Sequence, residues 1–503
     1  MEMSSKFTLP LAIGITNKHW VDTVVAHIAY ARSKETINSY EYDTSLQALN
    51  SLSTRIPEPS FEKFKGKAML VLPARVGDIL SQIPEKYAVL FAQIQVIRDN
   101  NSETLKKYYL YRNIIRDVAI RKKEVLQLLN GKVTSVGYQF ALVYSNLKVI
   151  LEGFVTSRRY LETINGGNDL SFFIEDYSVE KLNFIAKQLE LFNVSSFSSS
   201  NQNWFISSAK DLAQLSKGVI RYIKKFHEKG QADIDNNLLA QAENSIDSIL
   251  SCSVPEFAID FETYSSLFIQ VNNVFTAVIE IIQAIKFHDD VIEQEVTGIN
   301  KEKIIIILNQ LYASIFDGER KREVFEEVFY EAAEIDNMIY RLAQQINTEY
   351  RNSKDPVCCV GFTEGAIILL GKIIPLLNFP LYLVTYKFSF YGDEMSGDLS
   401  KEVVIDFDNS KYDGKRVLIF DDILDRGITV KKFLEQARMK TRAIDFKVCM
   451  LLVKPNPENV YGEVDFSGSM VSDVWVVGYG FDTNYKHRNA DGVGPIKESF
   501  KNL

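Results

Sequence analysis

The chain has 503 residues, of which 46% are hydrophobic and 24% charged; this is an ordinary soluble composition, and the chain is too long for one compact core. Two or three domains are therefore expected. The formal net charge of −8 argues against a general nucleic-acid scaffold, because phosphate binding draws its affinity from clustered lysine and arginine.

Cysteine usage and the first residues favour a reducing, cytoplasmic location. The cysteines show no metal-ligand spacing, and an adjacent pair lies in an apolar run that is typical of a buried strand. They are Cys252, Cys358, Cys359 and Cys449. Residues 1–10 have no basic segment followed by an apolar stretch and a cleavage site, so we expect no secretory signal.

No membrane association is expected either. The most membrane-like run is residues 365–384, but Lys372 and Pro375 interrupt it within the roughly 20 residues that a span requires. A buried helix followed by a strand is the favoured interpretation of this run.

The first segment, residues 1–98, is predicted to be mixed. Residues 9–15 and 68–72 resemble strands, and a helix is expected around residues 21–33. Residues 99–352 then show a helical pattern almost throughout, which predicts a helical domain for interaction with a protein partner or for oligomerisation. Its helix start and stop signals are Ser102, Ser178, Ser208, Gly131 and Gly230.

One helix is expected over residues 325–346, where apolar residues recur every three or four positions. They are Phe325, Val328, Ala332, Ile335, Ile339, Leu342 and Ile346. Ordinary packing within a helical bundle is favoured over a dedicated partner-binding surface. Residues 352–356 give the best domain boundary, and residues 353–503 alternate apolar strands with helices, as in an α/β domain with a mostly parallel sheet.

The central chemical signal is the run VLIFDDILDRGIT at residues 417–429, an apolar strand, two acids, a turn and the start of a helix. Carboxylates at the end of a strand accept hydrogen bonds from ribose hydroxyls, and a turn with glycine before a helix presents backbone N–H groups to phosphate. Alone, this motif would also suit a response regulator or a magnesium phosphatase.

Three further motifs follow the same order as in the hypoxanthine-guanine phosphoribosyltransferase family, which residues 357–496 resemble. The run at residues 417–429 is similar to the family's motif for phosphoribosyl pyrophosphate (PRPP). Phe390, Tyr391 and Gly392 resemble its mobile-loop signature, and LLVK at residues 451–454 resembles the strand with the base-recognition lysine. VWVVGYGFD at residues 474–482, followed by Arg488, resembles the purine-binding hood.

The resemblance implies a parallel sheet flanked by helices with a small hood, and a site for PRPP and Mg²⁺. Asp421 and Asp422 would hold the ribose hydroxyls and, with Asp482, the metal, which takes one or two carboxylates and fills its shell with water and substrate oxygens. The 5′-phosphate and pyrophosphate would lie against the PRPP-binding residues Arg426, Gly427, Ile428, Thr429, Glu364, Gly365 and Arg488.

The resemblance also implies the chemistry of the base. Asp425 would be the general base at purine N7, and Lys454 would donate to the 6-oxo group. Trp475 would stack on the purine, and the backbone of Val476 would read its edge near C2. Residues 390–401 are polar and contain glycines, as expected of a lid that excludes water.

Two residues depart from the family pattern. Arg426 stands where a Thr or Ser usually follows the catalytic Asp, and Glu364 stands in the turn after the strand at residues 357–361, where it would repel pyrophosphate unless magnesium intervenes.

Taken together, the four motifs favour a purine phosphoribosyltransferase that uses PRPP, with possible homo-oligomers. The sequence leaves open a regulator that senses PRPP or a nucleotide with little turnover, and a transferase with an unusual acceptor.

Overall fold

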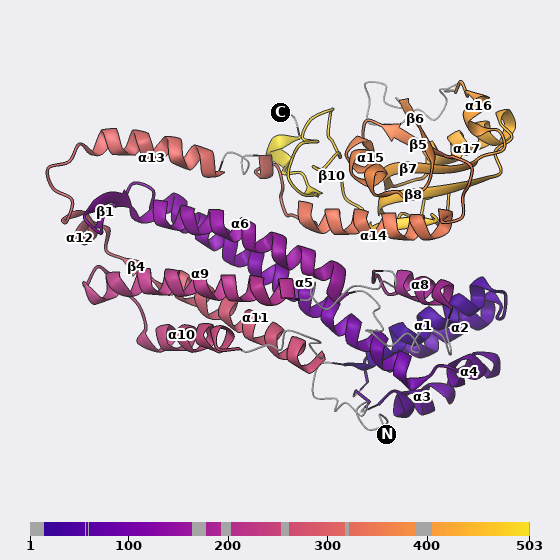
Figure 1. Ribbon diagram of the computed structural model, residues 1–503, viewed down its shortest axis with the longest axis horizontal. Coiled ribbons are helices and arrows are strands. Elements are labelled where there is room, and N and C mark those ends of the chain that lie inside the picture. The colour runs from indigo at the N-terminus through magenta and orange to yellow at the C-terminus, as the bar shows by residue number, and fades with distance from the viewer. Residues whose placement is uncertain are drawn as a thin grey trace. The chain divides into compact units, whose positions relative to one another are not determined.

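The computed structural model describes residues 15–55, 57–58, 60–162, 178–192, 203–252, 261–316, 321–387 and 405–501. The chain forms two compact units, Met1–Ile315 and Phe316–Leu503 (Figure 1). Each hydrophobic cluster of described residues lies within one unit, so each unit has a core of its own.

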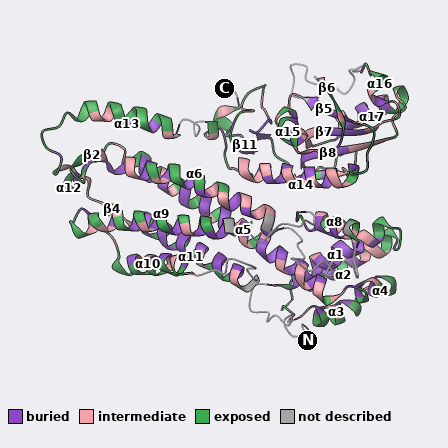
Figure 2. Ribbon diagram, viewed as in Figure 1, coloured by how far each residue is buried: buried purple, intermediate pink, exposed green. Residues whose placement is uncertain are grey.

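Long helices form the first unit. α5 (Glu85–Arg121) packs against α6 (Val136–Leu161) and α11 (Phe261–Ala284), and α9 (Asn203–Glu228) and α10 (Asn236–Leu250) complete the bundle. Buried residues follow the sides on which these helices meet (Figure 2). The helical domain predicted from the sequence is thereby confirmed in kind.

Shorter helices pack around one end of α5 and bury a cluster that includes Trp20, Phe61 and Phe64. They are α1 (Asn17–Ser33), α2 (Ser39–Ser53), α3 (Phe61–Met69) and α4 (Ala74–Ser81). α8 (Val179–Gln188) packs against α1 and α5 in a separate cluster. The structure differs here from the mixed segment expected from the sequence, because the run at residues 68–72 is the end of α3 and the turn after it. The run at residues 9–15 lies almost wholly outside the described residues.

Small elements connect the bundle. They are β1 (Leu126–Leu129), β2 (Lys132–Ser135), β3 (Ala232–Asp233), β4 (Lys286–Phe287), α12 (Asp289–Glu293) and α13 (Lys301–Phe316). Ser178 caps α8 and Gly230 follows α9, as their signals predicted. Ser102 and Ser208 instead lie inside α5 and α9, and Gly131 lies in the β1–β2 turn.

Within the described part of the chain, Thr263–Ala284 of α11 is long and apolar enough to cross a membrane, and more than half of it is buried in the bundle, as in a core helix.

A five-stranded parallel sheet forms the second unit, with the order β6-β5-β7-β8-β9. The strands are β5 (Val357–Thr363), β6 (Leu381–Lys387), β7 (Arg416–Leu424), β8 (Asp445–Val453) and β9 (Phe466–Met470). The run at residues 365–384 is α15 (Ile367–Ile373), the short helix η4 (Ile374–Leu376) and then β6, a helix followed by a strand as predicted.

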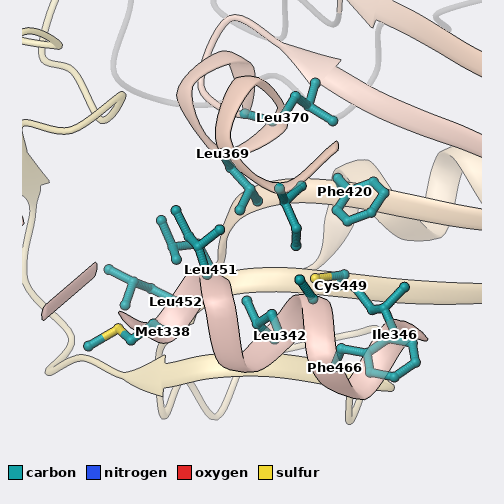
Figure 3. Packing of buried hydrophobic residues seen from close by; sticks show 14 of the residues in the cluster. Met338, Leu342, Ile346, Leu369, Leu370, Phe420, Cys449, Leu451, Leu452 and Phe466 are labelled. Atoms are coloured by element: carbon teal, nitrogen blue, oxygen red, sulfur yellow. The ribbon is translucent and has the colours of Figure 1, made fainter. Parts of the chain in front are cut away.

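Helices cover both faces of this sheet. α14 (Ala332–Tyr350) and α15 pack on one face, where Leu342, Ile346 and Leu369 meet Phe420, Cys449 and Leu451 of the strands (Figure 3). α16 (Asn409–Tyr412) and α17 (Ile428–Lys440) cover the other face. Successive side chains of a strand point to opposite faces, so Cys359 lies in the first core and Cys358 in the second.

The hood joins the end of the chain to the start of this unit. β10 (Val476–Val477) pairs with β11 (Gly494–Pro495), and η5 (Glu498–Phe500) follows. Residues 321–331 lie against β11: the backbone N–H of Glu326 donates to Pro495 O, and that of Val493 donates to Tyr330 O, both at 2.8 Å. A Cβ at Gly494 would lie 1.9 Å from Glu327 O, so glycine permits this close approach.

The helix expected over residues 325–346 therefore begins only at Ala332, because Phe325 and Val328 pack in the hood. α14 belongs to the core of the sheet rather than to the bundle. The second compact unit accordingly begins at Phe316, before the boundary that the sequence suggested at residues 352–356.

Candidate active site

Two adjacent carboxylates stand near the carboxyl end of β7, the edge of a parallel sheet at which ligands bind. The backbone N–H of Asp422 donates to Asp421 Oδ1 at 3.0 Å, and that of Ile423 donates to Asp422 Oδ1 at 2.8 Å. Burial, and next the charge of Asp422, raise the pKa of Asp421 well above its usual range. Burial likewise raises the pKa of Asp422 to about 6.

Glycine brings a loop from the neighbouring strand onto this pair. Gly365 follows β5, and a Cβ there would lie 2.0 Å from Asp422 Oδ2. Gly480 of the hood lies close as well, since its Cβ would be 2.8 Å from Gly365 O. The turn predicted to bind pyrophosphate and the hood thus converge on the acidic pair.

The turn between β7 and α17 presents a helix N-terminus. Gly427 has a left-handed φ of +71°, and a Cβ there would lie 2.6 Å from the Cβ of Tyr461. Ile428 and Thr429 form the first turn of the 13-residue α17, whose leading N–H groups have no carbonyl partner within the helix. Such a terminus suits the phosphate that the sequence assigned to it.

Asp425 lies in a network of donors. Lys454 Nζ donates to Asp425 Oδ2 at 2.9 Å, and Asn456 Nδ2 donates to Oδ1 at 2.5 Å. Lys454 is only 7% exposed and also lies 3.5 Å from Asp473 Oδ1. Burial acts to raise the pKa of Asp425, but the bonds from Lys454 and Asn456 outweigh it, and the pKa lies below its usual range.

The hood supplies the remaining predicted residues. Arg488 Nη2 lies 2.7 Å from Asp482 Oδ1, and the backbone N–H of Tyr485 donates to Asp482 Oδ2 at 2.8 Å. Trp475 is 47% exposed, and its Nε1 donates to the backbone O of Asp482 at 3.0 Å. An accessible ring with a fixed edge is compatible with the predicted stacking on a base. Val476 is buried in β10.

The two departures from the family pattern are both ion-paired. Glu364 Oε1 lies 2.6 Å from Lys387 Nζ at the end of β6, and Glu364 Oε2 lies 3.7 Å from Arg488. The bond from Lys387 lowers the pKa of Glu364. Arg426 points to Glu458, with 3.2 Å between Nε and Oε2, and both side chains are exposed.

The donor set fits the Mg²⁺ that the sequence implied. Among the described residues no three His, Cys, Asp or Glu side chains come together as a metal site. Magnesium needs only one or two protein carboxylates, however, and the adjacent, partly buried pair Asp421–Asp422, whose pKa values are raised, would be stabilised by a cation.

Residues of the predicted lid lie outside the described part of the chain, including Phe390, Tyr391 and Gly392. The structure adds residues that sequence reasoning missed: Asn456, Asp473 and Lys387. Asn456 stands between two prolines after β8, where an ordinary turn asparagine is expected, so its sequence gave no sign of a contact with Asp425.

Known proteins share this part of the chain. The family model of the phosphoribosyl transferase domain matches residues 330–484. The hypoxanthine-guanine-xanthine phosphoribosyltransferase of Tritrichomonas foetus is 32% identical over 180 residues, which are 35% of this chain and 93% of that protein. The chain therefore belongs to the phosphoribosyltransferase family.

Two further similar proteins are named for hypoxanthine. The hypoxanthine-guanine phosphoribosyltransferase of Aquifex aeolicus is 31% identical over 165 residues, covering 33% of this chain and 91% of that protein. A crystal structure of a hypoxanthine phosphoribosyltransferase from Staphylococcus aureus matches with 26% identity and a TM-score of 0.33, covering 35% of this chain and 95% of that one. About a third of the chain is covered in each case.

Proposed function

We propose that the second unit transfers the 5-phosphoribosyl group of PRPP to a 6-oxopurine and releases pyrophosphate. The observation that carries this proposal is the buried Lys454 beside Asp425 at the carboxyl edge of the sheet, 2.9 Å apart. An ammonium has three donors and no acceptor, so it matches a 6-oxo group, and the carboxylate beside it suits the N7 proton.

In the proposed reaction purine N9 forms a bond to ribose C1, and the bond from C1 to the pyrophosphate oxygen breaks with its electron pair leaving on pyrophosphate. Asp425 accepts the purine proton, and Lys454 holds the 6-oxo group. Asp421 and Asp422 accept hydrogen bonds from the ribose hydroxyls, while the first turn of α17 binds the 5′-phosphate. Arg488 binds the leaving pyrophosphate.

Magnesium, when bound, would supply positive charge that offsets the charge of pyrophosphate; Asp421, Asp422 and Asp482 would hold it. The raised pKa values of these two adjacent carboxylates support the assignment for Asp421 and Asp422.

Pyrophosphate release from PRPP, measured on the full chain with hypoxanthine, guanine, xanthine and adenine in turn, tests the proposal. We expect release that depends on a 6-oxopurine and is lost in Asp425→Asn. Release with none of the bases, together with measurable PRPP binding, would instead favour the second candidate.

That candidate is a regulator that binds PRPP or a nucleotide with little turnover. Glu364 favours it, because this carboxylate lies 3.7 Å from Arg488 and would oppose a pyrophosphate there. Glu364→Gln removes the charge and keeps the size. If Glu364 opposes the binding of PRPP, the variant should have a KM for PRPP several-fold lower than that of the wild-type chain. Lys415→Gln, at a lysine that pairs with Asp355, is the surface control.

A further inference from the structure

The side chain of Asn456 contacts the proposed general base but has no role in the chemistry above. Its Nδ2 donates to Asp425 Oδ1 at 2.5 Å, and its Oδ1 accepts a hydrogen bond from the backbone N–H of Glu458 at 2.9 Å. A backbone N–H only donates, so its partner must be the amide oxygen. The NH₂ group of Asn456 must therefore face Asp425.

The other oxygen of Asp425 is held by Lys454, at 2.9 Å. Lys454 is also the proposed donor to the 6-oxo group of the purine, and an ammonium that turns toward the base gives up part of its contact with Asp425. Oδ2 then becomes available to accept the proton from N7, while the bond from Asn456 to Oδ1 remains.

We propose that Asn456 is a positioning residue. Its bond to Oδ1 holds the Asp425 carboxylate in one orientation while the ammonium of Lys454 moves from Oδ2 of Asp425 to the purine. Its catalytic meaning rests on the proposed function, whereas the contact with Asp425 does not. A turn that merely connects β8 to the rest of the chain would not require a donor at this position.

The charges that face Asp425 set the direction of the expected effect. Lys454 and Arg426 favour the carboxylate; Asp473 lies beyond Lys454 at 3.5 Å from its Nζ, and Glu458 pairs with Arg426 at 3.2 Å. Loss of the donor from Asn456 removes one of the bonds that lower the pKa of Asp425. The pKa of Asp425 should rise, and the acidic limb of the plot of kcat against pH should move to higher pH.

Asn456→Asp separates the two roles, because it keeps an oxygen for the Glu458 amide and replaces the donor to Asp425 with a carboxylate. We expect kcat to fall by about 10- to 100-fold, the KM for PRPP to change little, and the acidic limb to move to higher pH. Asn459→Asp is the matched control: Asn459 stabilises the same turn through Tyr461 and Gly462 without a bond to Asp425, and the limb should not move.

A second measurement does not depend on turnover. In the full chain with ¹³C-labelled aspartate carboxyls, Asp425 is assigned by comparison with Asp425→Asn and titrated by NMR in wild type and in Asn456→Ala. A higher titration midpoint in Asn456→Ala supports the proposal. An unchanged titration midpoint, or a pH dependence of kcat in Asn456→Asp equal to that of wild type, would mean that Asn456 only stabilises the turn. If wild type released no pyrophosphate, the proposed function would fail and the titration alone would decide the role of Asn456.

Discussion

The hydroxyl of Tyr479 in the hood donates a hydrogen bond to the carboxylate of Asp336 on α14, and Lys372 of α15 lies 2.5 Å from the same carboxylate. Tyr479 stands between Gly478 and Gly480 in the loop that leads to Asp482. α14 is therefore joined to the loop with the residues proposed for metal and pyrophosphate.

Truncation should show that α14 is essential. A fragment of residues 316–503 is expected to fold and bind PRPP, whereas residues 352–503 should not melt cooperatively. The shorter fragment lacks buried side chains such as Ile335, Leu342 and Ile346, each worth about 1.5–3 kcal/mol, against a typical total stability of roughly 5–15 kcal/mol. Circular dichroism on heating and calorimetry with PRPP provide the measurements. A cooperative transition in the shorter fragment would contradict this expectation.

Gly365→Ala should damage the site without unfolding the protein. The new methyl group would lie 2.0 Å from Asp422 Oδ2, so the carboxylate or the loop must move. We expect kcat/KM for PRPP to fall about 100-fold, in the range seen when positioning near a reacting centre is disturbed. Gly371→Ala on α15 is the control, since a Cβ there meets nothing within 4 Å and should leave kcat/KM unchanged. Equal activity of both variants would disprove the close contact.

Asp425→Asn should preserve PRPP binding and lower turnover about 100-fold or more, because a positioned base typically contributes about 10²–10⁴ in rate. Asp473, the other carboxylate beside Lys454, is half-exposed. Asp473→Asn should therefore lower turnover much less. Single-turnover rates at saturating PRPP would compare the two. Similar losses in both variants would mean that the charge around Lys454, rather than a base at Asp425, matters.

Base selectivity follows from Lys454. A buried ammonium that faces the 6-amino group of adenine loses a hydrogen bond and keeps its desolvation cost, roughly 1–3 kcal/mol or about 5- to 150-fold. Adenine should be the poorest of the four bases in kcat/KM. Lys454→Met keeps a long apolar stem and should reduce the preference. Adenine accepted as well as hypoxanthine would show that Lys454 does not face the base.

Stability against pH should reveal the cost of the acidic pair. Because burial raises the pKa of Asp422 from 3.8 to about 6, the folded state binds more protons between these values, and stability falls as pH rises through that window. Asp422→Asn removes this effect and should be more stable by about 1–2 kcal/mol at pH 7, with a difference that shrinks toward pH 4. Chemical denaturation at several pH values would measure it. Asp408→Asn is the control, since the pKa of Asp408 is lowered and its loss should not stabilise.

The sheet and most of the candidate site followed from the sequence, because apolar runs such as β7 and β8 end at the residues that carry the chemistry. Strand ends meet at one edge, so Asp425 and Lys454 had to come close once the strands were parallel neighbours. The bond from Asn456 depends on the shape of a turn, which spacing along the chain does not define.

Helical spacing misled the prediction at Phe325 and Val328. These side chains are buried or partly buried, as the pattern indicated, but in the hood, where the backbone pairs with residues near β11. Apolar residues every three or four positions show that a segment is covered, not what covers it. Similarly, Ser102 reads as a helix start by local preference, yet α5 continues through it because tertiary packing overrides a local signal.

The position of residues 321–331 also determines how the second unit responds to a pulling force. This segment lies near the start of the second unit and is held by backbone bonds to Val493 and Pro495 and by the ion pair of Arg322 with Glu331 at 2.5 Å. A pulling force applied to the chain at residue 316 would therefore act on the hood before it acts on the sheet. In a single-molecule pulling experiment, the hood would be the first part of the second unit to yield.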